Sequence, residues 1–133
     1  MTQMKLAREG VISEQMAVVA QHEGLEAEVI RQGVAAGKIV IPANINHKNL
    51  VPCGIGQGLT TKVNANFGTS SDFGDQNSEL EKLRVASDVG ADTIMDLSTG
   101  GDIATIRRAI INASTLPVGT VPIYQAGIEA INR

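Results

Sequence analysis

The sequence has 133 residues, of which 43% are hydrophobic and 19% charged, and its net charge is −3. This balance is typical of one globular domain and excludes a disordered chain. The acidic balance, with one Tyr, two Phe and no Trp, argues against a nucleic-acid partner. Because no apolar run is long enough to cross a membrane and no signal-peptide pattern is present, we expect no membrane contact and a cytoplasmic location. The single cysteine, Cys53, excludes an internal disulfide and a cysteine-rich metal site within the chain.

The first part of the chain, residues 1–37, is predicted to be helical. Ser13 is a suitable N-cap for one helix, and Gly24 is a natural end for it. A second helix is predicted over residues 26–36, ending at Gly37. The faces expected to be buried consist of Met16, Val19 and Ala20 in the first helix, and Val29, Ile30 and Val34 in the second.

A short β-branched strand is predicted next, over residues 38–41, and it ends at Pro42. Residues 43–60 are predicted to form a loop, since Pro52 and glycines at 54, 56 and 58 interrupt any regular pattern. The glycine spacing differs from the dinucleotide-binding fingerprint, whose third glycine follows three residues after the second and opens a helix.

From Lys62 to Ala126 the sequence repeats one plan of a strand, a polar turn and a helix. Strands are predicted at 62–66, 93–97 and 118–124, and their C-terminal ends fall near Asn66, Met95 and Tyr124. These three residues are evenly spaced, and the interval is close to the length of one βα unit of a parallel sheet or barrel. Strand C-termini carry the ligand chemistry in such folds, so these three residues are the first site candidates.

The helices of this repeat have their own signals. Ser78 and Glu81 have the spacing of a capping box, and the buried side of that helix is expected to hold Leu80, Leu83, Val85 and Ala86 before Gly90 ends it. Asp102 is predicted to cap the next helix, which carries an apolar stripe of Ile103, Ile106 and Ile110. A third helix is predicted to begin at Gly127.

Several polar residues of the repeat allow two interpretations. Asn64 and Asn66 share one face of their strand, where they could bind a polar ligand or hydrogen-bond to neighbouring strands. Asp96 could orient a substrate or a neighbouring donor, but a role in the following turn is favoured. The turn at 98–101 precedes a helix and could hold a phosphate, although such turns are common.

The remaining candidates are also open to a structural explanation. Tyr124 could stack on or hydrogen-bond to a heterocycle, or fill the rim of a barrel. Met95 has the character of core packing. His22 and His47 lack metal-ligand spacing and are expected to be surface or locally bonded histidines.

Five motifs in order closely resemble the phosphomethylpyrimidine synthase (ThiC) family, in its compact form without an extra N-terminal domain. They are TQM at 2–4, IVIPANINH at 39–47, KVNAN at 62–66, GADTIMDLSTG at 90–100 and PVGTVPIYQA at 117–126. The resemblance runs from Thr2 to Arg133. It implies an α/β fold, with an N-terminal helical and β/loop segment over 1–61 and the first three βα units of an incomplete (β/α)8 TIM-type barrel over 62–133.

The resemblance also implies an activity. The family consists of radical S-adenosylmethionine (SAM) lyases that convert aminoimidazole ribotide into hydroxymethylpyrimidine phosphate in thiamine biosynthesis. Substrate contacts would fall on Asn66, Met95 and Tyr124, and the full-length protein would be a homodimer.

This chain departs from the family in the residues that hold the metals. The family binds a [4Fe–4S] cluster through a Cys-x-x-Cys-x-x-x-x-Cys motif and a divalent metal, zinc, through histidines of later strands; this sequence has neither set. Without metal ligands or catalytic residues of its own, the chain is expected to be inactive alone. The alternatives are 5-hydroxybenzimidazole synthase, which uses the same substrate, and a non-catalytic half-barrel that binds a ribotide or a partner chain.

Overall fold

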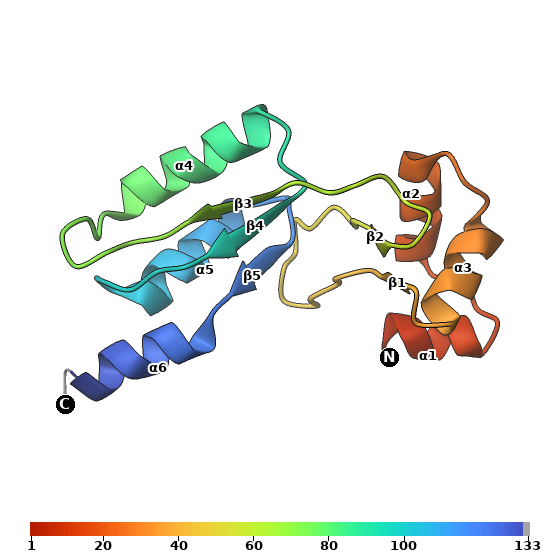
Figure 1. The fold of residues 1–133 in the computed structure, drawn as a ribbon, viewed down its shortest axis with the longest axis horizontal. Helices are drawn as coiled ribbons and strands as arrows, with labels where there is room; N and C mark the ends of the chain where they lie inside the picture. Colours follow the sequence, from red (N-terminus) through yellow and green to blue (C-terminus); the bar gives the residue numbers. More distant parts are fainter. Residues whose placement is uncertain (132–133) are drawn as a thin grey trace. The chain divides into compact units, whose positions relative to one another are not determined.

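The computed structural model describes residues 1–131, and it is a mixed α/β structure, as predicted. The chain divides into two compact units (Figure 1). One unit consists of Met1–Asn46 and Leu50–Lys62, and the other of His47–Asn49 and Val63–Arg133. Each unit has its own hydrophobic core.

The first unit contains three helices, α1 (Gln3–Arg8), α2 (Glu14–Glu23) and α3 (Ala27–Ala35). Both predicted ends of α2 are confirmed: the Oγ of Ser13 accepts a hydrogen bond from the Met16 N–H, and Gly24 adopts a left-handed conformation. The prediction that Val29 is buried was wrong, because its side chain is 50% exposed. The core of this unit consists of Ala7, Met16, Val19, Ala20, Ile30, Val34, Ile39 and Ile41.

Two short strands complete the first unit. β1 (Ile39–Val40) pairs antiparallel with β2 (Ile55–Gly56), which lies inside the predicted loop. A Cβ at Gly56 would meet the carbonyl oxygen of Lys38 at 2.2 Å, so glycine permits the close approach of the two strands. The predicted loop over residues 43–60 therefore contains a short strand.

The second unit is built on a parallel sheet in the order β3-β4-β5. The strands are β3 (Asn64–Phe67), β4 (Thr93–Asp96) and β5 (Val118–Thr120), and the connections contain α4 (Gln76–Asp88) and α5 (Ile103–Ala113). Both helices pack on one face of the sheet, because Leu83 of α4 and Ile110 of α5 share a cluster with Ile94 of β4. The full cluster consists of Leu83, Ile94, Ile106 and Ile110, with Phe67, Leu80, Leu116 and Val118 packed against it.

The helix starts in this unit were predicted with mixed success. Asp102 caps α5 by accepting a hydrogen bond from the Thr105 N–H, as predicted. The Ser78 capping box was wrong, because Asp75 is the N-cap of α4 and accepts from the N–H of Ser78 inside the helix. Aspartate caps a helix as well as serine does, so both positions are suitable caps and the folded chain uses Asp75. Val85, expected to be buried, is 46% exposed.

The third strand is shorter than predicted. β5 ends at Thr120 and α6 (Pro122–Ile131) begins two residues later, so Tyr124 lies in a helix and not at a strand end. Proline suits the first helical position, where its fixed φ is helical and its missing N–H is not needed. The helix predicted to begin at Gly127 therefore starts at Pro122, and residues 132–133 of that prediction lie outside the described residues.

His47 is buried, with 6% of its surface exposed, and its Nε2 lies 2.7 Å from the carbonyl oxygen of Ser114. The prediction of a surface or locally bonded histidine was wrong for this residue, since its partner is distant in sequence. His22 is exposed, in agreement with the prediction. Over residues 1–131, no helix combines the length and apolar character needed to cross a membrane.

Candidate functional site

The face of the second unit's sheet opposite α4 and α5 carries polar side chains. Successive strand residues point to opposite faces, and Phe67 and Ile94 belong to the helix-covered side. Asn64 and Asn66 on β3, and Thr93 and Met95 on β4, therefore share the other, open face. We refer to these four residues as the open-face cluster.

Hydrogen bonds order the open-face cluster. The Thr93 hydroxyl donates to Asn64 Oδ1 at 2.9 Å, and Asn64 Nδ2 donates to Asn66 Oδ1 at 2.6 Å. The internal bonding considered for these asparagines is therefore present. Within the described part of the chain, Asn66 Nδ2 has no hydrogen-bond partner, and its side chain is exposed. The cluster thus offers one oriented amide donor at the end of the row.

Met95 is the neighbour of Asn66 on the next strand. Asn66 and Met95 are Cα partners in the β3–β4 register, and Met95 pairs in turn with Gly119 of β5. A Cβ at Gly119 would lie 3.1 Å from both Sδ and Cε of Met95, so the thioether lies over the glycine. Of the three predicted site residues, the sheet brings Asn66 and Met95 together. Tyr124 follows in the first turn of α6, with 46% of its surface exposed.

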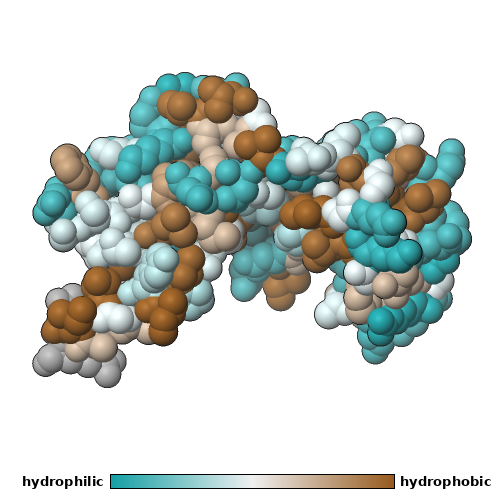
Figure 2. All heavy atoms as spheres, viewed as in Figure 1, coloured by the Kyte–Doolittle hydropathy of each residue, from teal (hydrophilic) through white to brown (hydrophobic). Residues whose placement is uncertain are grey.

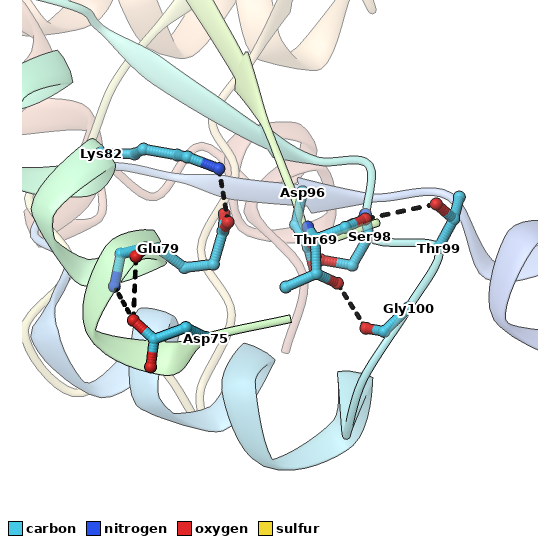
Figure 3. Close-up of polar contacts among 9 residues, drawn as sticks. Thr69, Asp75, Glu79, Lys82, Asp96, Ser98, Thr99 and Gly100 are labelled. Atoms are coloured by element: carbon cyan, nitrogen blue, oxygen red, sulfur yellow. Dashed lines mark hydrogen bonds and ion pairs between the residues drawn. The ribbon is translucent and has the colours of Figure 1, made fainter. Parts of the chain in front are cut away.

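Asp96, at the C-terminal end of β4, is 1% exposed and lies beside Ser98 (Figure 3). Its Oδ1 accepts hydrogen bonds from the N–H and hydroxyl of Ser98, and its Oδ2 accepts from Arg107 Nε at 2.8 Å. The turn role and the orientation of a neighbouring donor are therefore both observed. A buried carboxylate requires such a partner, because an isolated charge is costly away from water.

The loops after β3 and β4 are joined by hydrogen bonds around Thr69, which is buried (Figure 3). Its N–H donates to the Ser98 hydroxyl and its hydroxyl donates to the Gly100 carbonyl, while the Thr99 N–H donates to the Thr69 carbonyl. Since the N–H groups of Ser98 and Thr99 are bonded within these loops, they are not available to hold a phosphate.

Three polar residues that were not identified as site candidates from the sequence are Arg107, Gln125 and Glu79. Arg107 Nη1 donates to Gln125 Oε1 at 2.6 Å, which connects α5 to α6. Arg107 follows Ile103 by four residues, so it lies on the same helix face as the apolar stripe. A charged residue on that face is a sequence signal for a buried polar contact. Glu79 is 1% exposed and pairs with Lys82 at 2.6 Å (Figure 3), and its Oε2 is a buried oxygen without a partner among the described residues.

The residues present do not fit an iron–sulfur cluster. Such a cluster needs several thiolates, and the chain has the single Cys53. Across residues 1–131, no three His, Cys, Asp or Glu side chains are grouped as metal ligands. The open face instead offers the amides of Asn64 and Asn66, the Thr93 hydroxyl and the Met95 thioether.

A parallel sheet of βα units with helices on one face defines an α/β protein, a class whose ligand sites generally lie at the strand ends. The comparison of sequences makes this class specific: the chain belongs to the Radical SAM ThiC family, whose model matches residues 2–133.

Proteins named phosphomethylpyrimidine synthase are similar over the whole chain. The chain is 60% identical over 133 residues to the one from Dehalococcoides mccartyi strain BAV1 and 62% identical over 133 residues to that of Desulforamulus reducens. It is 58% identical over 134 residues to one from Thermus thermophilus. Each alignment covers 100% of this chain and 31% of the relative, so the chain spans about a third of the relatives' length.

Proposed function

We propose that this chain supplies the N-terminal part of a phosphomethylpyrimidine synthase, which converts aminoimidazole ribotide to hydroxymethylpyrimidine phosphate in thiamine biosynthesis. The observation that carries the proposal is 60% identity over all 133 residues to a protein of that name. The names of the relatives favour this product over 5-hydroxybenzimidazole. The working protein would be a cytoplasmic homodimer.

The sheet of the second unit would be the first part of a (β/α)8 barrel, with 62–133 as its first three βα units after the segment 1–61. Support comes from the parallel order of β3, β4 and β5 and from the helices on one face. In a barrel the helices lie outside, so the open-face cluster would point into the interior. The outer edges of β3 and β5 have no partner strand among the described residues, which leaves room for further strands.

The part of this chain in the reaction would be to bind and orient the ribotide. Asn66 Nδ2 would donate a hydrogen bond to it, Met95 would pack against the heterocycle, and the Tyr124 hydroxyl would make a second polar contact. The family implies SAM and a [4Fe–4S] cluster, and we include a zinc ion, but these groups would have to be held by residues other than those described.

The first experiment is the intact mass of the natural gene product, followed by an anaerobic assay. The protein is incubated with aminoimidazole ribotide, SAM and a reductant, and hydroxymethylpyrimidine phosphate is measured by mass spectrometry. Formation of that product is expected from a protein several times heavier than 13.9 kDa with a reconstituted cluster. A natural product of 13.9 kDa would require a second subunit for activity. No product from a cluster-loaded protein would overturn the proposal.

A further inference from the structure

Helix α6 carries Tyr124 but is not held by a hydrophobic core. None of its described residues is buried, and Figure 2 shows hydrophobic residues exposed along it. Ile123 is 71% and Ile131 81% exposed. Burial of an apolar face normally fixes a helix on its sheet, so we expect a different interaction to connect α6 to this unit.

That interaction is a polar one. Over residues 1–131, the bond from Arg107 Nη1 to Gln125 Oε1 is the single hydrogen bond that links an α6 residue to another helix or strand. Gln125 in turn donates from Nε2 to Glu129 Oε1 at 2.8 Å, one turn further along α6. The glutamine is therefore oriented from both sides.

Arg107 is itself fixed by Asp96. The carboxylate is 1% exposed and the arginine side chain 18% exposed, so the ion pair is largely shielded from water. The guanidinium is planar and presents its donors in a rigid fork, so Nε and Nη1 can serve two acceptors at once. One side chain thereby connects the end of β4 to α6.

We propose that Asp96, Arg107 and Gln125 form a positioning relay that fixes Tyr124 relative to Met95. Asp96 follows Met95 directly on β4, and Gln125 follows Tyr124 directly on α6. The relay acts as a positioning device, through its two neighbours Met95 and Tyr124. Its role in ribotide binding rests on the proposed function, while its effect on α6 does not.

Two variants of the natural gene product distinguish the effect of the relay from a general loss of stability. Gln125→Ala removes the link to α6 and leaves the Asp96–Arg107 pair intact. Arg107→Lys keeps the charge beside Asp96, but an ammonium lacks the fork that serves both acceptors. The matched control is Arg108→Gln, on the neighbouring exposed residue of α5.

The first measurement is hydrogen exchange of the backbone amides of 122–131, and the second is the dissociation constant for aminoimidazole ribotide. Both relay variants are expected to speed exchange in α6 by roughly 10-fold and to weaken ribotide binding by a similar factor, the amount expected for a lost hydrogen bond to a charged group. Arg108→Gln is expected to change neither. The double variant Gln125→Glu/Glu129→Gln keeps an acceptor for Arg107 at position 125, and the glutamine introduced at position 129 can donate to it. This double variant is therefore expected to match the unmodified protein in both exchange and affinity.

Unchanged exchange in α6 would overturn the relay, and so would faster exchange with unchanged ribotide affinity. If the unmodified protein fails to bind the ribotide, the proposed function fails instead. In that case the exchange of 122–131 still decides whether the relay holds α6.

Discussion

Asn66 and Met95 lie opposite each other as Cα partners on adjacent parallel strands. Their separation along the chain equals one strand–helix repeat, so the regular repeat itself places them side by side. Among the described residues, the amide donor of Asn66 has no partner, while the Met95 thioether lies over Gly119 of the next strand. We propose that the amide of Asn66 and the thioether of Met95 both face the ribotide on this side of the sheet.

The first prediction concerns the donor of Asn66. Asn66→Asp keeps the shape of the side chain but replaces the amide donor with an acceptor, so a ligand acceptor would face a carboxylate. We expect the affinity for aminoimidazole ribotide to fall by about 10-fold or more, the effect of losing one hydrogen bond and leaving its partner unpaired. Isothermal titration calorimetry measures this change. The same substitution at exposed Asn77 is the control, and equal affinities for both variants would contradict the assignment.

The second prediction concerns the space occupied by Met95. Gly119→Ala would place a Cβ 3.1 Å from Sδ and Cε of Met95, so the flexible thioether must move. We expect ribotide affinity to fall several-fold while the unfolding midpoint changes little, because the end of a methionine side chain adapts easily. Gly127→Ala is the matched control, since nothing lies within 4 Å of its added methyl group. Equal affinities of the two variants would show that Met95 does not line the site.

The fold could be predicted from the sequence where local chemistry and tertiary packing agree. Ser13, Gly24 and Asp102 end or begin helices because their side chains or backbone angles satisfy helix termini without distant partners. The β2 strand could not be predicted, because Gly56 pairs through its backbone and requires the distant Ile39. Local signals likewise cannot choose between Asp75 and Ser78 when both are good caps.

The candidate site was predictable in part for a similar reason. The even repeat of strand and helix places Asn66 beside Met95, since β3 and β4 pair in parallel register. The same spacing fails for Tyr124, because Pro122 starts a helix before a longer strand can form. Arg107 was missed since its two acceptors come from β4 and α6, which only the folded chain brings together.

The third prediction tests the buried ion pair by its effect on stability. Asp96→Asn removes the charge that compensates Arg107, and breaking a buried pair in this way costs about 3–5 kcal/mol of unfolding free energy. Urea unfolding followed by circular dichroism measures it. Asp88→Asn is the control, because its pair with Arg84 is 60% exposed on both sides, and no measurable change is expected there. Similar stabilities for the two variants would show that the Asp96 pair is solvated.

The last prediction concerns the pH dependence of the first unit. Burial raises the pKa of Glu23, but hydrogen bonds from Lys62 and Thr60 outweigh it and hold the net pKa below its usual value of 4.5. The unfolded chain therefore binds a proton at a higher pH than the folded chain does. Above a pH of about 4.5, the usual pKa, the stability contributed by Glu23 is complete. It is lost as the pH falls through the lower pKa of Glu23 in the folded protein.

Glu23→Gln should therefore lower stability near neutral pH by about 1.5–3 kcal/mol, the range for hydrogen bonds to a charged group. Below the folded pKa of Glu23 the difference should shrink, because the unmodified side chain is then also neutral. Urea midpoints measured from pH 7 down to about pH 2 give both curves. Glu9→Gln, on an exposed side chain, is the control for the change in net charge. A constant offset between the Glu23→Gln and unmodified curves at every pH would show that Glu23 acts through packing and not through its charge.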